Sequence, residues 1–229
     1  MSAPEGTDMK LTVFGATGGI GRQLLAQAAA AGHEVTAVAR DPRRLPPGVR
    51  AVAADLAAPD AAVLRDAIAG ADAVLSAVGP SSRATAGITE PATRAIVGAM
   101  ADAGVRRIVV VSAAPVGTVP SPGNPHPPKH DPGDGPLMRY VVGPLIKAAL
   151  RDHYADLARM EDVLRGSGLD WTAVRPPKLT DKPLTGTYRT ELDRNVRGGA
   201  LASRANVAAC MLASLERPET VGRAVGVAD

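Results

Sequence analysis

Short apolar runs alternate with longer alanine-rich segments through the first half of the chain. The apolar runs are five or six residues long and rich in β-branched side chains, as is typical of buried strands, and they cover residues 10–14, 34–39, 50–54, 73–77 and 107–112. Segments of helical length lie between them and cover residues 19–31, 60–69 and 91–103. Right-handed crossovers between such strands and helices build a parallel sheet. The pattern therefore predicts an α/β fold with a doubly wound parallel sheet, the Rossmann arrangement, in a single domain.

The pattern changes after Ser112, where proline and glycine dominate residues 115–136. This segment cannot form a helix or a central strand, so we expect a long mobile loop. A long helix is predicted next, from about Leu137 to Arg165, with Gly143-Pro144 as the candidate kink. The last third predicts a strand, an irregular segment, a second strand, a helix and a final strand, over residues 171–175, 176–186, 187–192, 203–215 and 224–227. We assign residues 1–8 to a flexible leader and residues 9–229 to the domain.

Composition excludes several classes of protein. Hydrophobic residues make up 45% and charged residues 21%, which argues against disorder and coiled coil, and aromatic residues make up only 2%, so the core must be aliphatic. The net charge of +3 is too small to indicate nucleic acid as a partner, and no base-stacking aromatic residue lies among the arginines. No apolar run approaches the roughly 18 residues of a membrane span, and the first residues lack the pattern of a secretory signal. We therefore expect a cytoplasmic protein without a membrane partner.

The remaining composition argues against disulfides and metals. The single cysteine, Cys210, excludes a disulfide framework and is expected to be a small buried hydrophobe. His126, His130 and Asp131 lie in the proline-rich segment, where we interpret their spacing as incidental, so no metal is expected. We interpret His153 as structural, and Ser203 as the N-cap of the last helix.

The first strand runs directly into a glycine-rich turn that opens a helix. Glycines allow a tight turn, a close approach of the backbone to a pyrophosphate, and close packing of the helix on the strand. The helix N-terminus then offers unpaired N–H groups and a partial positive charge to the phosphates. Because the turn lies in the first βαβ unit, it predicts a dinucleotide site with contacts from Gly15, Thr17, Gly18, Gly19, Ile20 and Gly21.

The end of the second strand indicates which dinucleotide is bound. An acidic residue there would accept from the ribose 2′-hydroxyl of NAD, whereas this chain has Arg40, whose guanidinium suits the 2′-phosphate of NADP(H). Asp41 could hold a 2′-hydroxyl, but its place before Pro42 favours a turn. Arg43 and Arg44 are either further phosphate ligands or a solvated turn. The prediction is NADP(H) over NAD(H).

The carboxyl ends of the other parallel strands should face the same cofactor. Asp55 and Leu56 follow the third strand, where the carboxylate either accepts from the adenine amino group or forms a turn. Small residues after the fourth strand allow the backbone to pass close to a ribose, and we expect contacts there from Val78 and Gly79. At the nicotinamide end we expect contacts from Ser112 and Pro176.

Several segments match a known pattern, namely the glycine turn, residues 38–42 (VARDP), Asp55-Leu56, residues 72–77 and residues 109–113. With them the chain resembles the atypical short-chain dehydrogenase/reductases, the NAD(P)-binding superfamily related to NmrA. The second half is most similar to the biliverdin-IXβ reductases, also called flavin reductases (NADPH), through residues 159–169, Pro176-Pro177 and residues 181–188. The resemblance covers nearly the whole chain except the leader and residues 115–136. It implies an NADPH-dependent reductase.

One departure from this superfamily limits the reaction. Typical short-chain dehydrogenases use a Tyr and a Lys four residues apart, so that the Lys lowers the pKa of a Tyr that passes a proton to a carbonyl. Here Pro144 lies four residues after Tyr140, and Ala158 four residues after Tyr154. A flavin, a quinone or another conjugated planar acceptor spreads the incoming charge itself, so the protein only has to position it against the nicotinamide.

We therefore expect an oxidoreductase that passes hydride from NADPH to such a planar acceptor. The candidate catalytic residues are Ser112, which would orient substrate or ring, and Lys178, which stands where the flavin reductases have a histidine after the proline pair. Residues 115–136 would form a lid, and residues 176–200 the substrate side. The alternative is a non-catalytic NADP(H)-binding redox sensor of the NmrA type, and an isomerase is a third hypothesis. A monomer is expected, since nothing in the sequence indicates a helix-pair interface.

Overall fold

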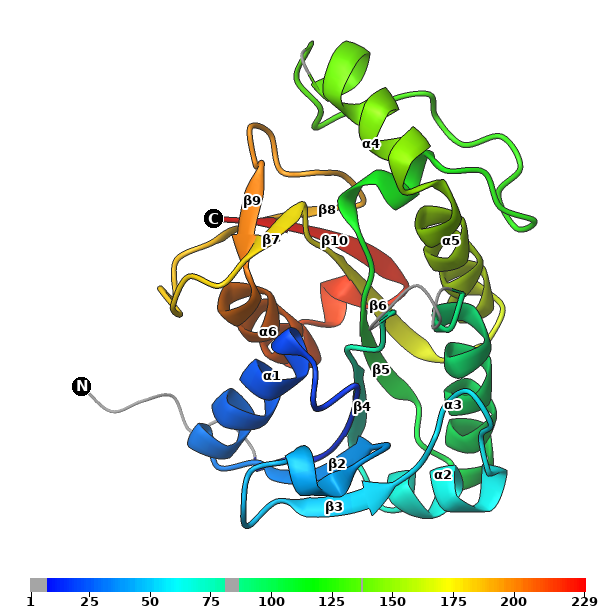
Figure 1. Cartoon of the computed structure of the whole chain (residues 1–229), viewed down its shortest axis with the longest axis vertical. Coiled ribbons are helices and arrows are strands. Elements are labelled where there is room, and N and C mark those ends of the chain that lie inside the picture. Colours follow the sequence, from blue (N-terminus) through cyan, green and yellow to red (C-terminus); the bar gives the residue numbers. More distant parts are fainter. Residues whose placement is uncertain (1–7, 81–86, 137) are drawn as a thin grey trace.

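A computed structural model describes residues 8–80, 87–136 and 138–229, so the leader predicted for residues 1–8 lies outside the described residues except for Asp8 (Figure 1). The central sheet has eight strands in the order β3-β2-β1-β4-β5-β6-β10-β8. These strands are β1 (Lys10–Phe14), β2 (Glu34–Ala39), β3 (Arg50–Ala53), β4 (Ala73–Ser76), β5 (Arg107–Val111), β6 (Asp170–Arg175), β8 (Arg189–Leu192) and β10 (Arg223–Ala228). All neighbours pair in parallel except β10 and β8, which are antiparallel. This confirms the doubly wound parallel sheet.

Helices cover both faces of the sheet (Figure 1). The helices are α1 (Gly19–Ala30), α2 (Ala61–Ile68), α3 (Thr89–Ala103), α4 (Gly143–Ala149), α5 (Arg151–Arg165) and α6 (Arg204–Ala213). The core on the face of α2, α3 and α5 is built around Phe14, Ile96 and Met160, and the core on the face of α1 and α6 around Leu24 and Met211. Aliphatic residues dominate both cores, as the composition predicts. In the described parts of the chain, no helix has the length and apolar character that crossing a membrane requires.

Two predictions about strands need correction. β3 forms as expected but lies at the edge of the sheet, and most of its side chains are exposed, so it is not a buried strand. The segment predicted to be irregular after Pro176 contains β7 (Lys178–Thr180), which pairs in parallel with β9 (Leu201–Ser203) in a separate two-stranded sheet. Strands of three residues are too short to show a hydrophobic period, so no pattern in the sequence indicates them.

The long helix predicted up to Arg165 is in fact divided at Leu150. A π-helical turn, Met138–Val142, runs into α4, and Leu150 separates α4 from α5 with φ −117° and ψ 28°. Gly143-Pro144 lies where the π-helical turn passes into α4, so the helix changes its hydrogen-bonding pattern next to a proline that has no backbone N–H to donate.

The proline-rich segment, residues 115–136, is a loop with a 3-10 turn at its start, Ala114–Thr118. Hydrogen bonds anchor it to the rest of the domain. Asp131 is buried and accepts a hydrogen bond from the backbone N–H of Asn195 at 2.8 Å. Ser121 donates to Asp162 on α5 at 3.0 Å. These bonds hold the loop against one face of the sheet, next to α5.

Candidate functional site

The glycine turn joins β1 to α1 at the carboxyl edge of the sheet. Gly15 has φ +69°, and a β-carbon on it would lie 2.5 Å from the carbonyl oxygen of Ala77 after β4. A β-carbon on Gly21 would lie 2.1 Å from the carbonyl oxygen of Gly15. Both positions therefore require glycine, the first for the backbone conformation and the second for the close approach of α1 to the turn.

The start of α1 is open to an anion. Gly18 is the N-cap and supplies no side-chain hydrogen bond, and no acidic residue lies in the first turn of the helix. Among the residues that the structure describes, none offers a capping oxygen or a carboxylate to the first N–H groups of α1, so a phosphate can accept from them.

The end of β2 carries the residues expected to select the cofactor. Asp41 accepts from the backbone N–H of Arg43 at 3.2 Å and from its Nε at 2.8 Å, so it forms the turn that the following proline favours. The side-chain hydrogen bond from Arg43 is the largest effect on the carboxyl of Asp41 and lowers its pKa. Arg40 is exposed directly after β2, at the same edge of the sheet as the glycine turn.

The residues expected near adenine and ribose occupy the predicted strand ends. Asp55 is exposed after β3, and its Oδ1 accepts from the backbone N–H of Ala57 at 3.0 Å, which is the turn interpretation. Leu56 packs against the core. Val78 is buried beside Gly15, and a β-carbon on Gly79 would meet no atom within 4 Å. Of these residues, the structure brings Val78 closest to the glycine turn.

At the end of β5, Ser112 belongs to a buried polar network. Its hydroxyl donates to Oε1 of Glu161 on α5 at 2.8 Å. Arg175, the last residue of β6, donates to the same carboxylate through Nε at 2.9 Å and also through Nη2. Glu161 has no exposed surface, and Arg165 contributes a further ion pair at 2.9 Å. The sequence analysis missed Glu161 and Arg175, because they lie 49 and 63 residues beyond Ser112 in the printed sequence and share no local motif with it.

Arg175 keeps its charge in this network. Burial lowers the pKa of the Arg175 guanidinium, but the charge of Glu161 and its hydrogen bonds outweigh burial, so the net shift is upward. The hydroxyl of Ser112 donates its hydrogen bond to the buried carboxylate of Glu161.

Lys178, the other candidate catalytic residue, is exposed at the start of β7. The carbonyl of Pro176 accepts a hydrogen bond from the backbone N–H of Ala114 at 2.9 Å. Backbone contacts thus join the chain after β5 to the chain after β6.

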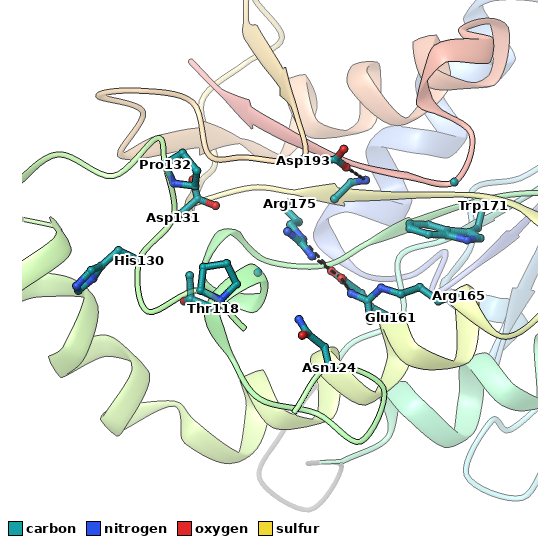
Figure 2. A pocket seen from close by; sticks show the side chains of 14 residues that line it. Thr118, Asn124, His130, Asp131, Pro132, Glu161, Arg165, Trp171, Arg175 and Asp193 are labelled. Carbon is teal, nitrogen blue, oxygen red and sulfur yellow. Dashed lines mark hydrogen bonds and ion pairs between the residues drawn. The ribbon is translucent and has the colours of Figure 1, made fainter. Parts of the chain in front are cut away.

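A cavity of about 470 Å³ lies between the proline-rich loop, α5 and the strands β6 and β10 (Figure 2). Its walls include the three charged residues of the buried network, Glu161, Arg165 and Arg175, together with Trp171 on β6. Asp131 and His130 line it from the loop, as Figure 2 shows. The cavity forms where the proline-rich loop, α5 and the sheet meet, so sequence periodicity does not indicate it.

Comparison with known proteins agrees with the geometry of the glycine turn. A family model described as NAD(P)H-binding matches residues 15–218. A solved structure from Burkholderia pseudomallei, described as a candidate exported protein, is 30% identical, with 96% of this chain and 100% of that chain covered and a TM-score of 0.69.

Two other solved structures share the fold at lower identity. A short-chain dehydrogenase/reductase from Veillonella parvula in complex with NADP is 18% identical over 96% of this chain and 94% of that chain, with a TM-score of 0.76. A candidate NADH-flavin reductase from Streptococcus pneumoniae is 23% identical over 96% of this chain and 99% of that chain, with a TM-score of 0.72.

Proposed function

Because this chain belongs to the NAD(P)H-binding family, we propose that it is a reductase that passes hydride from NADPH to a flavin, a quinone or a similar conjugated planar acceptor. When bound, the nicotinamide supplies the hydride. The chain's own residues then have to hold the phosphates, select the phosphorylated nucleotide and position the acceptor. We assign the first task to residues 15–21 and the second to Arg40.

The environment of the tyrosines supports a conjugated acceptor, because neither Tyr140 nor Tyr154 has the lysine partner of a proton donor. Tyr154 is only 7% exposed, and burial raises the pKa of its hydroxyl, so it is a poor proton donor at neutral pH. The residue one turn later is Ala158, not a lysine that would lower this pKa. Tyr140 is well exposed but is followed by Pro144 at the same spacing. Reduction of a simple ketone needs such a donor, whereas a conjugated acceptor does not.

The residues at the end of β5 and after β6 support the same acceptor class. Ser112 is bonded to Glu161, so we propose that it fixes the carboxyl end of β5 beside the nicotinamide and does not donate a proton itself. Lys178 is an exposed cation that would attract an acidic substituent such as a flavin phosphate. The similarity to the flavin reductases and the solved NADH-flavin reductase candidate favour a flavin as the acceptor. Lys178 replaces the histidine that the flavin reductases have after the proline pair, and this replacement argues against a tetrapyrrole.

Oxidation of NADPH, followed by its absorbance, tests this proposal directly. FMN, dichlorophenolindophenol and menadione are offered as acceptors, and each is repeated with NADH. We expect oxidation with at least one acceptor and a preference for NADPH. NADPH binding without oxidation by any of the three acceptors would contradict the reductase and favour a redox-sensing regulator.

A further inference from the structure

Arg204, the first residue of α6, lies across the first residue of α1. A β-carbon on Gly19 would lie 2.5 Å from Cδ and 2.8 Å from Nε of Arg204, so the aliphatic stem of this arginine fills the space that a side chain would take. The guanidinium therefore stands beside the uncapped N–H groups at the start of α1. Neither the glycine motif nor the family match identifies this residue.

Gly19 and Arg204 meet because their helices pack together and begin at the same edge of the sheet. Helices α1 and α6 pack side by side on one face of the sheet (Figure 1). α1 follows β1, and α6 leads back toward the start of β10, so both helices begin at the carboxyl edge of the sheet. Ser203 fixes the start of α6 by accepting from the backbone N–H of Asn206 at 3.0 Å.

The small sheet of β7 and β9 supplies a partner for Arg204. Its register pairs Thr180 with Ser203, which places the next residues, Asp181 and Arg204, beside each other. Nη1 of Arg204 donates to Oδ1 of Asp181 at 2.6 Å. The side chain of Asp181 is 88% exposed, so water competes strongly with this ion pair and the pair is weak.

We propose that Arg204 is a cofactor-binding residue that exchanges Asp181 for the pyrophosphate of the dinucleotide. The inference rests on the proposed function, because it assumes that the phosphates lie on the start of α1. A phosphate there accepts from the helix N–H groups and from the guanidinium together, and charge-assisted bonds of this kind are stronger than a solvated ion pair. Asp181 holds Arg204 at the turn in the free protein and competes with the phosphates for it.

This role is distinct from the role of Arg40. The pyrophosphate is common to NADPH, NADH and ADP-ribose, so Arg204 adds to the affinity for all three. Arg40 acts on the 2′-phosphate and adds only to the affinity for NADPH. ADP-ribose, which lacks both the nicotinamide and the 2′-phosphate, is therefore the probe of choice for Arg204.

Calorimetric titration with ADP-ribose and NADPH tests the proposal. Arg204→Gln keeps most of the stem over Gly19 but removes the charge, and we expect affinity for both ligands to fall about tenfold, while Arg204→Lys retains the charge and loses only about threefold. Asp181→Asn removes the competing charge and should tighten both ligands about two- to fivefold. The control is Arg217→Gln, whose arginine pairs with Glu219 at 2.8 Å just before β10, at the opposite edge of the sheet, and should change neither affinity.

Unchanged ADP-ribose affinity in Arg204→Gln, or weaker binding in Asp181→Asn, overturns this role of Arg204. A folding defect cannot produce the tighter binding expected of Asp181→Asn, so that variant decides the question even if Arg204→Gln is unstable. Failure of the unaltered protein to bind either ligand would instead refute the proposed function.

Discussion

At the scale of one residue, we propose that Arg40 sets which nucleotide is preferred. We expect Arg40→Ala to weaken NADPH binding about tenfold and to leave NADH binding unchanged, because only NADPH carries the 2′-phosphate. Dissociation constants for both nucleotides check this. Arg43→Ala is the matched control, since the guanidinium of Arg43 is bound to Asp41 and should contribute little. Equal losses for the two nucleotides in Arg40→Ala would show that this arginine does not read the 2′-phosphate.

Cys210 is 1% exposed, as expected of a small buried hydrophobe. Burial raises the pKa of its thiol to about 12, so almost no thiolate exists at pH 8. We expect the native protein to react very slowly with a thiol reagent such as dithionitrobenzoate, and the urea-unfolded protein to react at once. Absorbance of the released thionitrobenzoate measures both rates. Rapid reaction of the native protein would contradict the burial of this thiol.

His153 should make stability depend on pH. Burial lowers its pKa, an effect that Asp156 partly opposes, and its buried Nδ1 has no hydrogen-bond partner among residues 8–80, 87–136 and 138–229. As pH falls below the unfolded value of about 6.5, the unfolded chain binds a proton that the folded protein does not, so the free energy of unfolding falls. We expect His153→Gln to flatten this fall between about pH 7 and pH 5 in urea titrations. His126→Gln in the proline-rich loop is the control, and an unaltered slope in His153→Gln would contradict the assignment.

At the scale of elements, a side chain of α5 caps the N-terminus of α3, although the two helices are far apart in the sequence. Asp156 on α5 is 1% exposed and accepts from the backbone N–H groups of Thr89 and Glu90, at 2.9 and 3.1 Å. Asp156→Ala leaves these donors without the carboxylate and should cost about 2 kcal/mol, whereas Asp60→Ala, at the exposed N-cap of α2, should cost about 1 kcal/mol. Urea unfolding of both variants measures the difference. A cost for Asp156→Ala no larger than for Asp60→Ala would show that burial of this cap adds nothing.

The elements that the sequence predicts well are those with a local signal. β1 and β2 begin and end at the predicted residues, because apolar runs bounded by polar residues define them. The edge position of β3, the break at Leu150 and the pairing of β7 with β9 were not predicted. Each of these depends on what packs against the segment, and no local pattern of side chains encodes that.

At the scale of the whole molecule, the buried ion pair of Glu161 and Arg175 joins α5 to β6, and the hydrogen bond from Ser112 ties the end of β5 to the same carboxylate. Removing one partner leaves the other charge buried, so Arg175→Met should lower the free energy of unfolding by about 3–5 kcal/mol. The double variant Glu161→Met with Arg175→Met should recover much of this loss. Denaturant unfolding tests both.

The control for this pair is Arg194→Ala, which breaks an exposed ion pair with Glu191 and should cost less than about 1 kcal/mol. If Arg175→Met costs no more than Arg194→Ala, the buried pair does not stabilise the assembly of these three elements.

Some residues of the candidate site have a local sequence signal and others do not, as is also true of the helices and strands. The glycine turn and the strand-end residues could be predicted, because a strand, a turn and a helix that follow one another determine their positions. The network around Glu161 and the approach of Arg204 to Gly19 could not, since residues far apart in the sequence form both contacts. The cavity beside Trp171 depends on how the proline-rich loop and α5 meet the sheet, which no local pattern encodes.

The packing of α1 against α6 has a consequence for the life history of the protein. A ribosome makes the nucleotide-binding turn well before it makes α6, which packs beside it. We therefore expect a nascent chain to need both segments before it binds a coenzyme firmly. Bound coenzyme stabilises the native state over the unfolded state, so the unfolded fraction should fall as the concentration of pyridine nucleotide rises.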